Sequence, residues 1–254
     1  MRELKFIEGR KAPIYFAEST DSTNTRLKEL ARQGAPQGTV VAALEQTGGK
    51  GRLGRRFTSP PGGLYLSILW RPDCSPEKAA RLSCVGALAA CAAIEESCGL
   101  SPDIKWPNDL LLKGKKISGI LTEAAWQKEG GWVIVGTGIN VNTESFPPQL
   151  QSIASSLYLE TGRRIEPEKL MAAFISRLDS VYRAWGEEGA PFLEEYRRRC
   201  ITPGRDILID HEGGRAKVHA LSVEDDYSLL IQWPDGRRRK RASEKFFSWS
   251  NKSD

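Results

Sequence analysis

Histidine is nearly absent from this chain of 254 residues, which contains only His211 and His219, both near the C-terminus. A histidine-based catalytic triad or a histidine-rich metal site would have to be built from that short stretch. The five cysteines are an odd number, and Cys84, Cys91 and Cys98 recur every seven residues in an alanine-rich helical pattern. Neighbours in this series lie about 10 Å apart, too far for a disulfide or a shared metal ion. The pattern therefore predicts a buried helix face.

Long apolar runs and an N-terminal signal segment are also missing. No stretch reaches the ~20 apolar residues of a membrane span, and the N-terminal residues carry charges every few positions without an apolar core. We therefore expect a cytoplasmic globular protein with no membrane partner. The length allows one large core, or one domain with a small appendage. The net charge of +5 suits an anionic substrate without requiring nucleic acid.

Glycine and positive charge are concentrated in the segment 45–59, Glu-Gln-Thr-Gly-Gly-Lys-Gly-Arg-Leu-Gly-Arg-Arg-Phe-Thr-Ser. Glycines let backbone N–H groups approach an anion closely, and guanidinium groups offer paired donors to phosphate oxygens. Ordering such a segment costs roughly 1–2 kcal/mol per residue, so we expect it to stay mobile until it closes over a phosphate. The alternative is a flexible surface loop. The segment has neither the Gly-Lys-Ser/Thr end of a Walker A loop nor the Gly-x-Gly-x-x-Gly of a Rossmann fold.

Hydrophobic periodicity and capping residues divide the chain into strands and helices. Strands are predicted at 14–17, 39–44, 64–70, 110–112, 115–123 and 132–135. Helices are predicted at 25–33, 76–98, 166–185 and 190–199, the second with Ser75 as its N-cap and Gly99 after its last residue. A turn at Lys113-Gly114 is predicted to join the strands 110–112 and 115–123 into a hairpin. The glycines of 136–140 follow the strand 132–135 and indicate close backbone approach, either to a neighbouring element or to a ligand.

From Thr202 onward the pattern changes to short alternating runs separated by turn residues. This pattern predicts a small β barrel or sandwich of about fifty residues. The basic run 237–241 follows its last hairpin turn. Such a run can contact nucleic acid or an acidic partner, but a charged, solvated strand at a sheet edge is the favoured interpretation.

Five motifs follow one another between residues 21 and 140. They are Asp21-Ser22-Thr23-Asn24, Gly49-Lys50-Gly51-Arg52-Leu53-Gly54-Arg55, Lys105-Trp106-Pro107-Asn108-Asp109, Lys116-Ile117-Ser118-Gly119-Ile120-Leu121 and Gly136-Thr137-Gly138-Ile139-Asn140. Together and in this order they resemble the biotin protein ligases. The small C-terminal β domain extends the resemblance to nearly the whole chain.

The resemblance implies an α+β fold. A mixed β-sheet flanked by helices, related to the class II aminoacyl-tRNA synthetase core, would be followed by a small SH3-like β-barrel. The catalytic domain that binds biotin and ATP would occupy residues 1–200, and the β domain residues 201–254. Some family members carry an N-terminal DNA-binding domain. Only about thirteen residues precede the first predicted strand here, so the implied form lacks that domain and no DNA partner is expected.

The implied reaction has two steps. Biotin and ATP form biotinyl-5′-AMP and pyrophosphate, and a lysine of a biotin carboxyl carrier protein then takes the biotinyl group. Because the first step brings a carboxylate against a phosphate, cations and oriented donors can supply most of the catalysis without histidine. Mg²⁺ is implied as the companion of ATP. The carrier would belong to acetyl-CoA carboxylase or a related biotin-dependent carboxylase, and the sequence leaves open which carrier it is and whether the chain forms a homodimer.

By resemblance, catalysis falls to Lys116, Arg52 and Asp109. Lys116 would bridge the biotin carboxylate and the α-phosphate, Arg52 would close over the phosphates with Arg55, and Asp109 would orient Mg²⁺ or the incoming lysine. No set of protein ligands that would hold a metal by itself is predicted. The implied contacts to biotin and nucleotide come from Ser22, Thr23, Asn24, Gln46, Gly49, Lys50, Arg52, Arg55, Lys105, Lys116, Gly119, Leu121, Gly136 and Asn140. Of these, Ser22, Thr23 and Gln46 would bind the ureido ring, and Lys105 with Asn140 the nucleotide.

The chain departs from the family pattern at two positions. Lys50 stands where arginine is usual, which keeps the charge and loses the paired donors of a guanidinium group. Phe57 stands where tryptophan is frequent, and we expect this to be a packing difference only.

Two other functions remain open at this point. Lipoate and octanoate ligases share the catalytic fold, although the glycine-rich segment and Lys-Trp-Pro-Asn-Asp favour biotin. A nucleic-acid-binding module could use Arg52, Arg55 and the run 237–241, but it would need base-stacking aromatics beside them. The candidates for that role are Phe57, Phe246, Phe247 and Trp249.

Overall fold

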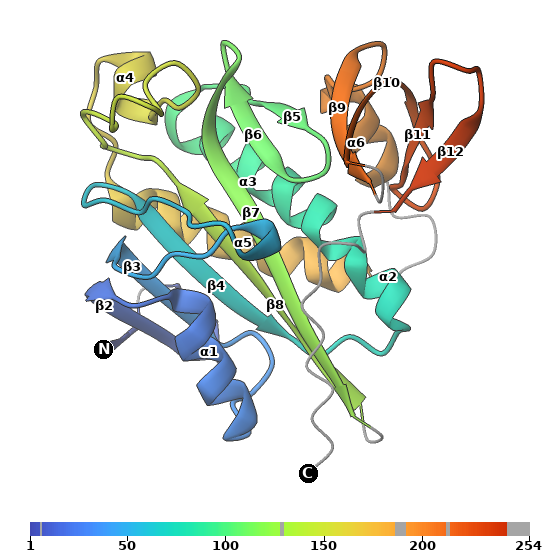
Figure 1. Cartoon of the computed structure of the whole chain (residues 1–254). Helices are drawn as coiled ribbons and strands as arrows, with labels where there is room; N and C mark the ends of the chain where they lie inside the picture. Colours follow the sequence, from blue (N-terminus) through green and yellow to red (C-terminus); the bar gives the residue numbers. More distant parts are fainter. Residues whose placement is uncertain (6, 128–129, 186–191, 212–213, 243–254) are drawn as a thin grey trace.

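A computed structural model describes residues 1–5, 7–127, 130–185, 192–211 and 214–242. An eight-stranded mixed sheet forms the main body, with strand order β1-β2-β3-β4-β8-β7-β6-β5 (Figure 1). Its strands are β1 Arg2–Leu4, β2 Ile14–Thr20, β3 Val40–Gln46, β4 Leu64–Trp70, β5 Asp103–Lys105, β6 Asp109–Leu112, β7 Lys115–Gln127 and β8 Gly130–Ile139. Neighbouring strands pair antiparallel except β2 and β3, which run parallel on either side of helix α1 in the sequence.

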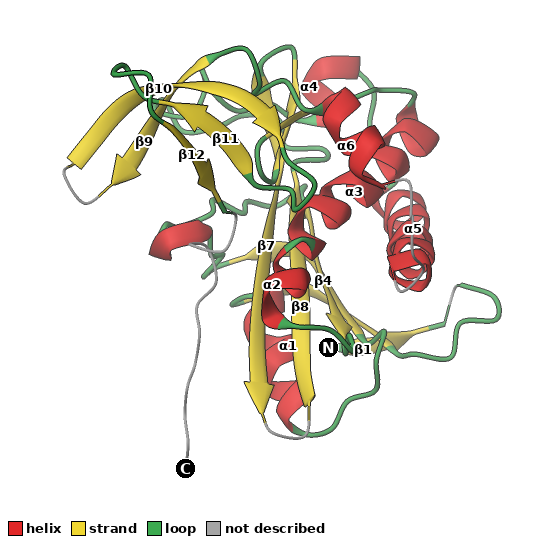
Figure 2. Cartoon of the chain, turned by 90° about the vertical axis from the view of Figure 1, so that its right-hand side faces the viewer, coloured by secondary structure: helices red, strands yellow, loops and turns green. Residues whose placement is uncertain are grey.

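Helices cover both faces of this sheet (Figures 1 and 2). On one face lies α1 (Thr23–Arg32), and its Leu27 packs with Val41 and Ile134 in a small core cluster. On the other face lie α3 (Leu82–Cys98) and α5 (Pro167–Trp185), which enclose the larger core. Because strand side chains alternate, Val41 faces α1 while its neighbours on β3 face the larger core.

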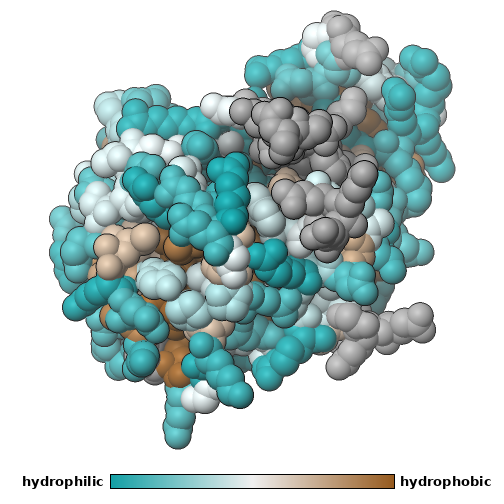
Figure 3. Space-filling model, turned by 90° about the horizontal axis from the view of Figure 1, so that it is seen from below, coloured by the Kyte–Doolittle hydropathy of each residue, from teal (hydrophilic) through white to brown (hydrophobic). Residues whose placement is uncertain are grey.

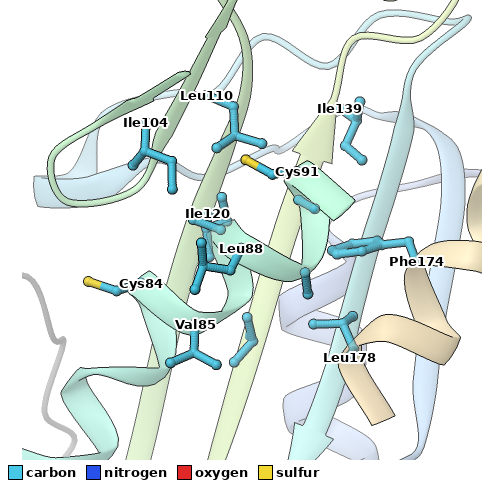
Figure 4. Close-up of a cluster of buried hydrophobic side chains, with 14 of the residues drawn as sticks. Cys84, Val85, Leu88, Cys91, Ile104, Leu110, Ile120, Ile139, Phe174 and Leu178 are labelled. Atoms are coloured by element: carbon cyan, nitrogen blue, oxygen red, sulfur yellow. The ribbon is translucent and has the colours of Figure 1, made fainter. Parts of the chain in front are cut away.

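Helix α3 is apolar all round because it lies between the sheet and α5. Cys84 and Cys91 are fully buried in this core and Cys98 is half-buried, all three with free thiols, which confirms the predicted packing role of the cysteine series (Figure 4). Gly86 lets the helix approach β8, since a Cβ there would lie 2.9 Å from Val135.

The capping residues predicted for the segment 76–98 are confirmed. Ser75 Oγ accepts a hydrogen bond from the backbone N–H of Lys78, and Gly99 ends the helix at a left-handed φ of 71°. The single long helix was wrong in one detail. Arg81, with φ −69° and ψ −19°, separates a short α2 (Pro76–Ala80) from α3.

The structure differs from the sequence prediction most clearly in β8, which continues to Ile139 instead of ending at Val135. Gly136 and Gly138 both lie within its ladder, paired with β4 and β7. Strand β5 and the short helix α4 (Leu157–Thr161) were not predicted. Helix α5 begins one residue after the predicted start and ends at the predicted residue, Trp185, while the first residues of the predicted helix 190–199 lie outside the described part.

A second, four-stranded antiparallel sheet follows helix α6 (Phe192–Arg199). Its strands are β9 Asp206–His211, β10 Gly214–Val223, β11 Leu229–Gln232 and β12 Arg238–Arg241, in the order β12-β11-β10-β9. The predicted small β unit is confirmed, but its described strands do not close into the SH3-like barrel that we expected. Four of the five residues of the basic run, Arg238–Arg241, form β12, a mostly exposed strand at the edge of the described sheet, as predicted.

The described surface is mostly hydrophilic, as the face in Figure 3 shows. Over all the described residues, the large apolar side chains that remain exposed are Met1, Ile153, Leu159 and Leu208. Within the described residues, no helix combines the length and apolar character needed to cross a bilayer. The aromatic residues Phe246, Phe247 and Trp249 lie outside the described residues.

Candidate active site

A cavity of about 950 Å³ lies where the eight-stranded sheet meets the C-terminal sheet. Its walls come from the start of α1, the glycine-rich loop, the segment before β6, strands β7 and β8, and strand β9. The cavity brings together most residues that the sequence predicted for the site. They are Ser22, Thr23, Asn24, Gln46, Lys50, Arg52, Arg55, Lys105, Asp109, Lys116, Gly119, Leu121 and Gly136.

One end of the cavity is polar and is built on the N-terminus of α1. Ser22 is the N-cap of this helix, and its side chain accepts from the backbone N–H of Thr25. The backbone N–H of Thr23 donates to Gln46 Oε1 at 2.9 Å, and the Thr23 hydroxyl lies 3.1 Å from the same oxygen. The Gln46 amide donates in turn to Ser59 Oγ at 3.0 Å. These contacts fix the amide of Gln46 at the end of β3, facing the cavity.

Glycines allow side chains to lie directly on the strands beside this polar end. A Cβ on Gly136 would overlap the Asn24 side chain, with 2.7 Å to its Cγ. A Cβ on Gly138 would lie 2.5 Å from the ring of Phe57, and one on Gly119 would lie 3.3 Å from the same ring. Of the two interpretations of the 136–140 glycines, close approach by neighbouring side chains is therefore confirmed.

The glycine-rich loop contains a short 3₁₀ turn, η1 (Arg52–Gly54), closed by a hydrogen bond from the Gly51 N–H to the Arg55 carbonyl at 2.7 Å. From this turn, Arg52 reaches across the cavity and donates from Nη1 to Asn108 Oδ1 at 2.6 Å. Desolvation lowers the pKa of Arg52 to about 10, against the attraction of Asp109, so the guanidinium keeps its charge at neutral pH. Arg55 is more exposed and lies 3.9 Å from Asp210 of β9.

Lys116, at the start of β7, lines the cavity. Its Nζ lies 2.6 Å from Asp109 Oδ1 and 5.5 Å from the centre of the Phe57 ring. The two charged side chains come from adjacent strands of one hairpin, β6 and β7, whose turn at Lys113-Gly114 was predicted. Lys116 and Arg52 thus place two positive charges at one cavity wall, with Asp109 beside both.

The segment 105–108 is held from behind by the C-terminal part of the chain. Tyr196 of α6, fully buried, donates from its hydroxyl to the Pro107 carbonyl at 2.8 Å. The backbone N–H of Trp106 donates to Thr202 Oγ1 and its indole N–H to the Tyr227 carbonyl, both at 2.9 Å. The position of this cavity wall therefore depends on residues far apart in the sequence.

Two predicted site residues lie outside the cavity lining. Asn140 is buried and donates from Nδ2 to the Ser155 carbonyl at 2.9 Å, so its side chain holds the segment after β8 and does not face the cavity. Gly49 is also buried, and a Cβ there would lie 2.5 Å from the Phe57 carbonyl. Its role in the structure is to let the two arms of the loop pack together.

Several residues at the cavity were missed by the sequence analysis. Phe57 was noted only as a packing difference from the usual tryptophan, and its ring lies over Gly138 and 5.5 Å from Lys116 Nζ. The apolar ring directly after a polar loop was the available signal. Asn108 was quoted within a motif but given no role. The wall formed by the C-terminal sheet had no signal in the sequence; it includes Arg205, Asp206, Leu208, Asp210, Arg215 and Arg241.

The described part of the chain offers few side-chain ligands for a metal ion. Among the described residues, no three histidine, cysteine, aspartate or glutamate side chains gather in a way that could hold an ion. Asp109 is the carboxylate nearest to the two catalytic candidates, Lys116 and Arg52. This donor set fits a Mg²⁺ ion that takes most of its ligands from phosphate and water.

Comparison with known proteins agrees with this arrangement. Residues 16–140 match the biotin/lipoate A/B protein ligase family. The bifunctional ligase/repressor BirA of Bacillus subtilis is 33% identical over 231 residues, which cover 89% of this chain and 71% of that protein. The chain belongs to the biotin/lipoate A/B protein ligase family. A second relative is the biotin--[acetyl-CoA-carboxylase] ligase of Paracoccus denitrificans. It is 33% identical over 239 residues, which cover 90% of this chain and 98% of the Paracoccus protein.

Solved structures show the same fold. The biotin protein ligase from Aquifex aeolicus in complex with biotin and ATP superposes with a TM-score of 0.78 at 29% sequence identity. The match covers 92% of this family member and 97% of the Aquifex chain. Because nearly all of both chains takes part, the C-terminal sheet as well as the eight-stranded sheet belongs to the shared architecture.

Proposed function

We propose that this protein is an ATP-dependent biotin protein ligase, which activates biotin as biotinyl-5′-AMP and transfers it to a lysine of a biotin carboxyl carrier protein. The observation that carries the proposal is the cavity itself. A polar end built by Thr23 and Gln46 and two cations, Arg52 and Lys116, open into one space. This combination suits a ligand with a hydrogen-bonding ring at one end and a carboxylate, next to a phosphate, at the other.

Biotin fits the polar end through its ureido ring. The ring is neutral and carries both N–H donors and a carbonyl acceptor. Ser22 can donate its hydroxyl proton, because the oxygen is the acceptor in the helix cap. Gln46 has a second amide proton beyond the one given to Ser59. The glycines and Leu121 leave room for the rest of the bicyclic ring and its apolar chain.

In the first step, the biotin carboxylate attacks the α-phosphate of ATP and pyrophosphate leaves. The obstacle is the repulsion between two anions, and charge increases on the phosphoryl oxygens in the transition state. Lys116 and Arg52 oppose that charge from a partly desolvated wall, where their attraction exceeds its value in water. On binding phosphate, Lys116 would give up or share its contact with Asp109. Arg52 would do the same with its hydrogen bond to Asn108.

Mg²⁺ would be held by Asp109 together with the phosphates of ATP. It would neutralise part of the triphosphate charge. Lys105 and Arg55 lie on the same rim and would contact the nucleotide. We assign these steps to residues 1–200 and treat 201–254 as a separate unit that completes the cavity wall.

In the second step, the amine of the carrier lysine attacks the acyl carbon of biotinyl-5′-AMP, and AMP leaves. An acyl-adenylate is prone to hydrolysis, so the loop that carries Arg52 has a second use. Closed over the adenylate, it keeps water out until the carrier docks. The sequence-based expectation that this loop orders on ligand binding is part of the proposal.

Lipoate and octanoate are the alternative acids to test. Neither has a ring with N–H donors, so neither would use the polar end of the cavity. The decisive experiment is ATP/pyrophosphate exchange with biotin, lipoate and octanoate compared side by side. We expect exchange with biotin at least about tenfold faster than with either other acid, from the loss of one or more hydrogen bonds. Equal or faster exchange with lipoate or octanoate would overturn the proposal.

A further inference from the structure

A chain of hydrogen bonds leads from the polar end of the cavity into the protein interior. Thr23 and Asn24 line the cavity, and Ser67 of β4 lies behind them. Ser67 Oγ is 2.7 Å from Thr23 Oγ1 and 2.5 Å from Asn24 Oδ1. Asn24 Nδ2 is 2.7 Å from Oε2 of Glu123 on β7. The chain therefore connects Thr23 to a carboxylate that does not line the cavity.

Glu123 is 7% exposed and forms an ion pair with Lys28 of α1, with Nζ 2.5 Å from Oε1. A carboxylate paired with an ammonium group can only accept hydrogen bonds. Asn24 must therefore turn its NH₂ group toward Glu123 and its carbonyl oxygen toward Ser67. The same NH₂ group lies 3.4 Å from the Leu121 carbonyl, a second acceptor that favours this orientation.

The orientation of Asn24 decides where the remaining protons lie. Its Oδ1 cannot donate, so the single hydroxyl proton of Ser67 is directed to it. Thr23 then gives its own proton to Ser67, because their 2.7 Å contact needs a proton and that of Ser67 is already given to Asn24. With this proton directed into the wall, Thr23 Oγ1 presents a lone pair to the cavity.

We infer that Glu123 is a positioning residue that sets the hydrogen-bond polarity of the biotin pocket, so that Thr23 Oγ1 acts as an acceptor for a ligand N–H. This inference rests on the proposed function. It assigns the preference for a cyclic urea to a carboxylate that cannot touch the ligand. A pocket in which Thr23 faces the cavity as an acceptor selects a ligand with an N–H group, which lipoate and octanoate lack in the part that would enter.

The test uses Glu123→Gln. This substitution keeps the shape of the side chain, but the amide can donate hydrogen bonds as well as accept them. Lys28 will attract the amide oxygen of the new side chain, so the amide NH₂ will face Asn24. Asn24 must then rotate and donate to Ser67, and Ser67 will donate to Thr23. Thr23 Oγ1 then accepts from Ser67 with one of its two lone pairs, and its own proton, no longer held by Ser67, turns toward the cavity, which weakens it as an acceptor for the ligand N–H. We expect biotin affinity, measured by calorimetry, to fall about tenfold, the value of one lost hydrogen bond. The KM for ATP should stay the same.

The double variant Lys28→Met/Glu123→Gln is the matched control. Without the ammonium group, the glutamine can turn its oxygen toward Asn24 and restore the original direction of the chain. Biotin affinity should return to within about threefold of Lys28→Met alone, a difference below 1 kcal/mol. Thermal melting of all variants checks that they fold. If Glu123 had a purely structural role, adding Lys28→Met to Glu123→Gln would lower biotin affinity further instead of restoring it.

The outcomes separate this inference from the proposed function. If the unmodified protein binds biotin and supports exchange, but folded Glu123→Gln binds biotin as well as the unmodified protein, the inference is wrong and the function stands. The same holds if the double variant binds no more tightly than Glu123→Gln. If the unmodified protein binds no biotin, both fail.

Discussion

Arg52 and Asn108 join the glycine-rich loop to the opposite wall of the cavity through a hydrogen bond of 2.6 Å from Nη1 to Oδ1. Asn108 is buried, and its backbone carbonyl accepts from the Ile120 N–H at 3.1 Å, so it is a fixed anchor point on the hairpin β6–β7. The loop thus has a defined docking contact at the place where phosphates would lie. In the function proposed above, closure of the loop and neutralisation of the adenylate would use the same guanidinium group.

Replacing Arg52 with glycine should loosen this closure and let activated biotin escape. We expect biotinyl-5′-AMP to appear in solution and labelling to spread from the carrier to other proteins. The measurement is quantification of free adenylate together with labelling of a protein mixture. Arg163→Gly, which removes an exposed arginine outside the cavity lining, is the control. Carrier-selective labelling that is the same in Arg52→Gly and the unmodified protein would contradict the role of the loop.

Lys116→Ala should abolish biotin-dependent ATP/pyrophosphate exchange while the fold persists. The side chain is about one-third exposed, so its loss costs little stability, whereas its charge lies where the two anions must meet. We expect a decrease in exchange of at least 10²-fold, as for a lost electrostatic contact in a transition state. The control is Lys115→Ala, the neighbouring lysine, which donates to the Gln151 carbonyl on the surface. Near-normal exchange in Lys116→Ala would remove this residue from the mechanism.

Gly138→Ala should displace the ring of Phe57 from the wall of the cavity. The new Cβ would lie 2.5 Å from the ring, so either the ring or the strand must move. We expect a loss of about 1–3 kcal/mol in the free energy of unfolding, the usual cost of overpacking, with weaker biotin binding. Denaturant unfolding measures the first effect. Adding Phe57→Ala should recover part of the stability, and a further decrease in the double variant would contradict the overlap.

Because of the ion pairs of α6, the free energy of unfolding should depend on pH in the acidic range. Arg199 is largely buried and contacts Glu95 at 2.8 and 2.9 Å, and this hydrogen bonding lowers the pKa of Glu95. Hydrogen bonds from Arg198, and then Arg199, lower the pKa of Glu195 to about 2. Both carboxylates thus stabilise the fold above their ordinary pKa of 4.5. This contribution is lost as the pH falls below 4.5, and for Glu195 the loss extends down to about 2.

The variant that tests this dependence is Glu95→Gln. Because Glu95 is about one-third exposed, solvent screening reduces the loss to about 1–2 kcal/mol at pH 7. The difference from the unmodified protein, measured by thermal melting, should shrink as the pH falls below 4.5. Glu96→Gln removes the exposed pair with Arg177 and should change little at any pH. A loss for Glu95→Gln that is constant across pH would exclude the ion pair as its cause.

The sequence predicted those parts of the fold that depend on neighbours in the chain. Strand β4 was placed at Leu64–Trp70 because all seven residues suit a buried strand, and every one of them is buried. The turn at Lys113-Gly114 and the caps at Ser75 and Gly99 follow from local backbone preferences. Thirteen predicted site residues line one cavity. Twelve of them belong to the five motifs, and Gln46 ends strand β3 before the glycine-rich loop. The motifs meet there because they lie at the ends of neighbouring strands, in the loops between them and at the start of α1.

The remaining features depend on contacts that sequence spacing does not encode. Strand β8 continues through Gly136 and Gly138 because Asn24 and Phe57 fill the space that side chains would occupy. Asn140 is the last residue of the last site motif, but its amide donates to the Ser155 carbonyl and is directed away from the cavity. The direction of such side chains is decided by partners that are distant in the sequence.

The hydrogen bond from Tyr196 to the Pro107 carbonyl bears on how this ligase could be divided into two fragments. A cut after residue 200 would leave the phenol on the larger piece and assign Thr202 and Tyr227, the acceptors of the Trp106 groups, to the smaller one. Reassembly of such fragments would then rebuild one wall of the reaction chamber. A split reporter made in this way would be switched by proximity of its halves, with biotin transfer as the signal.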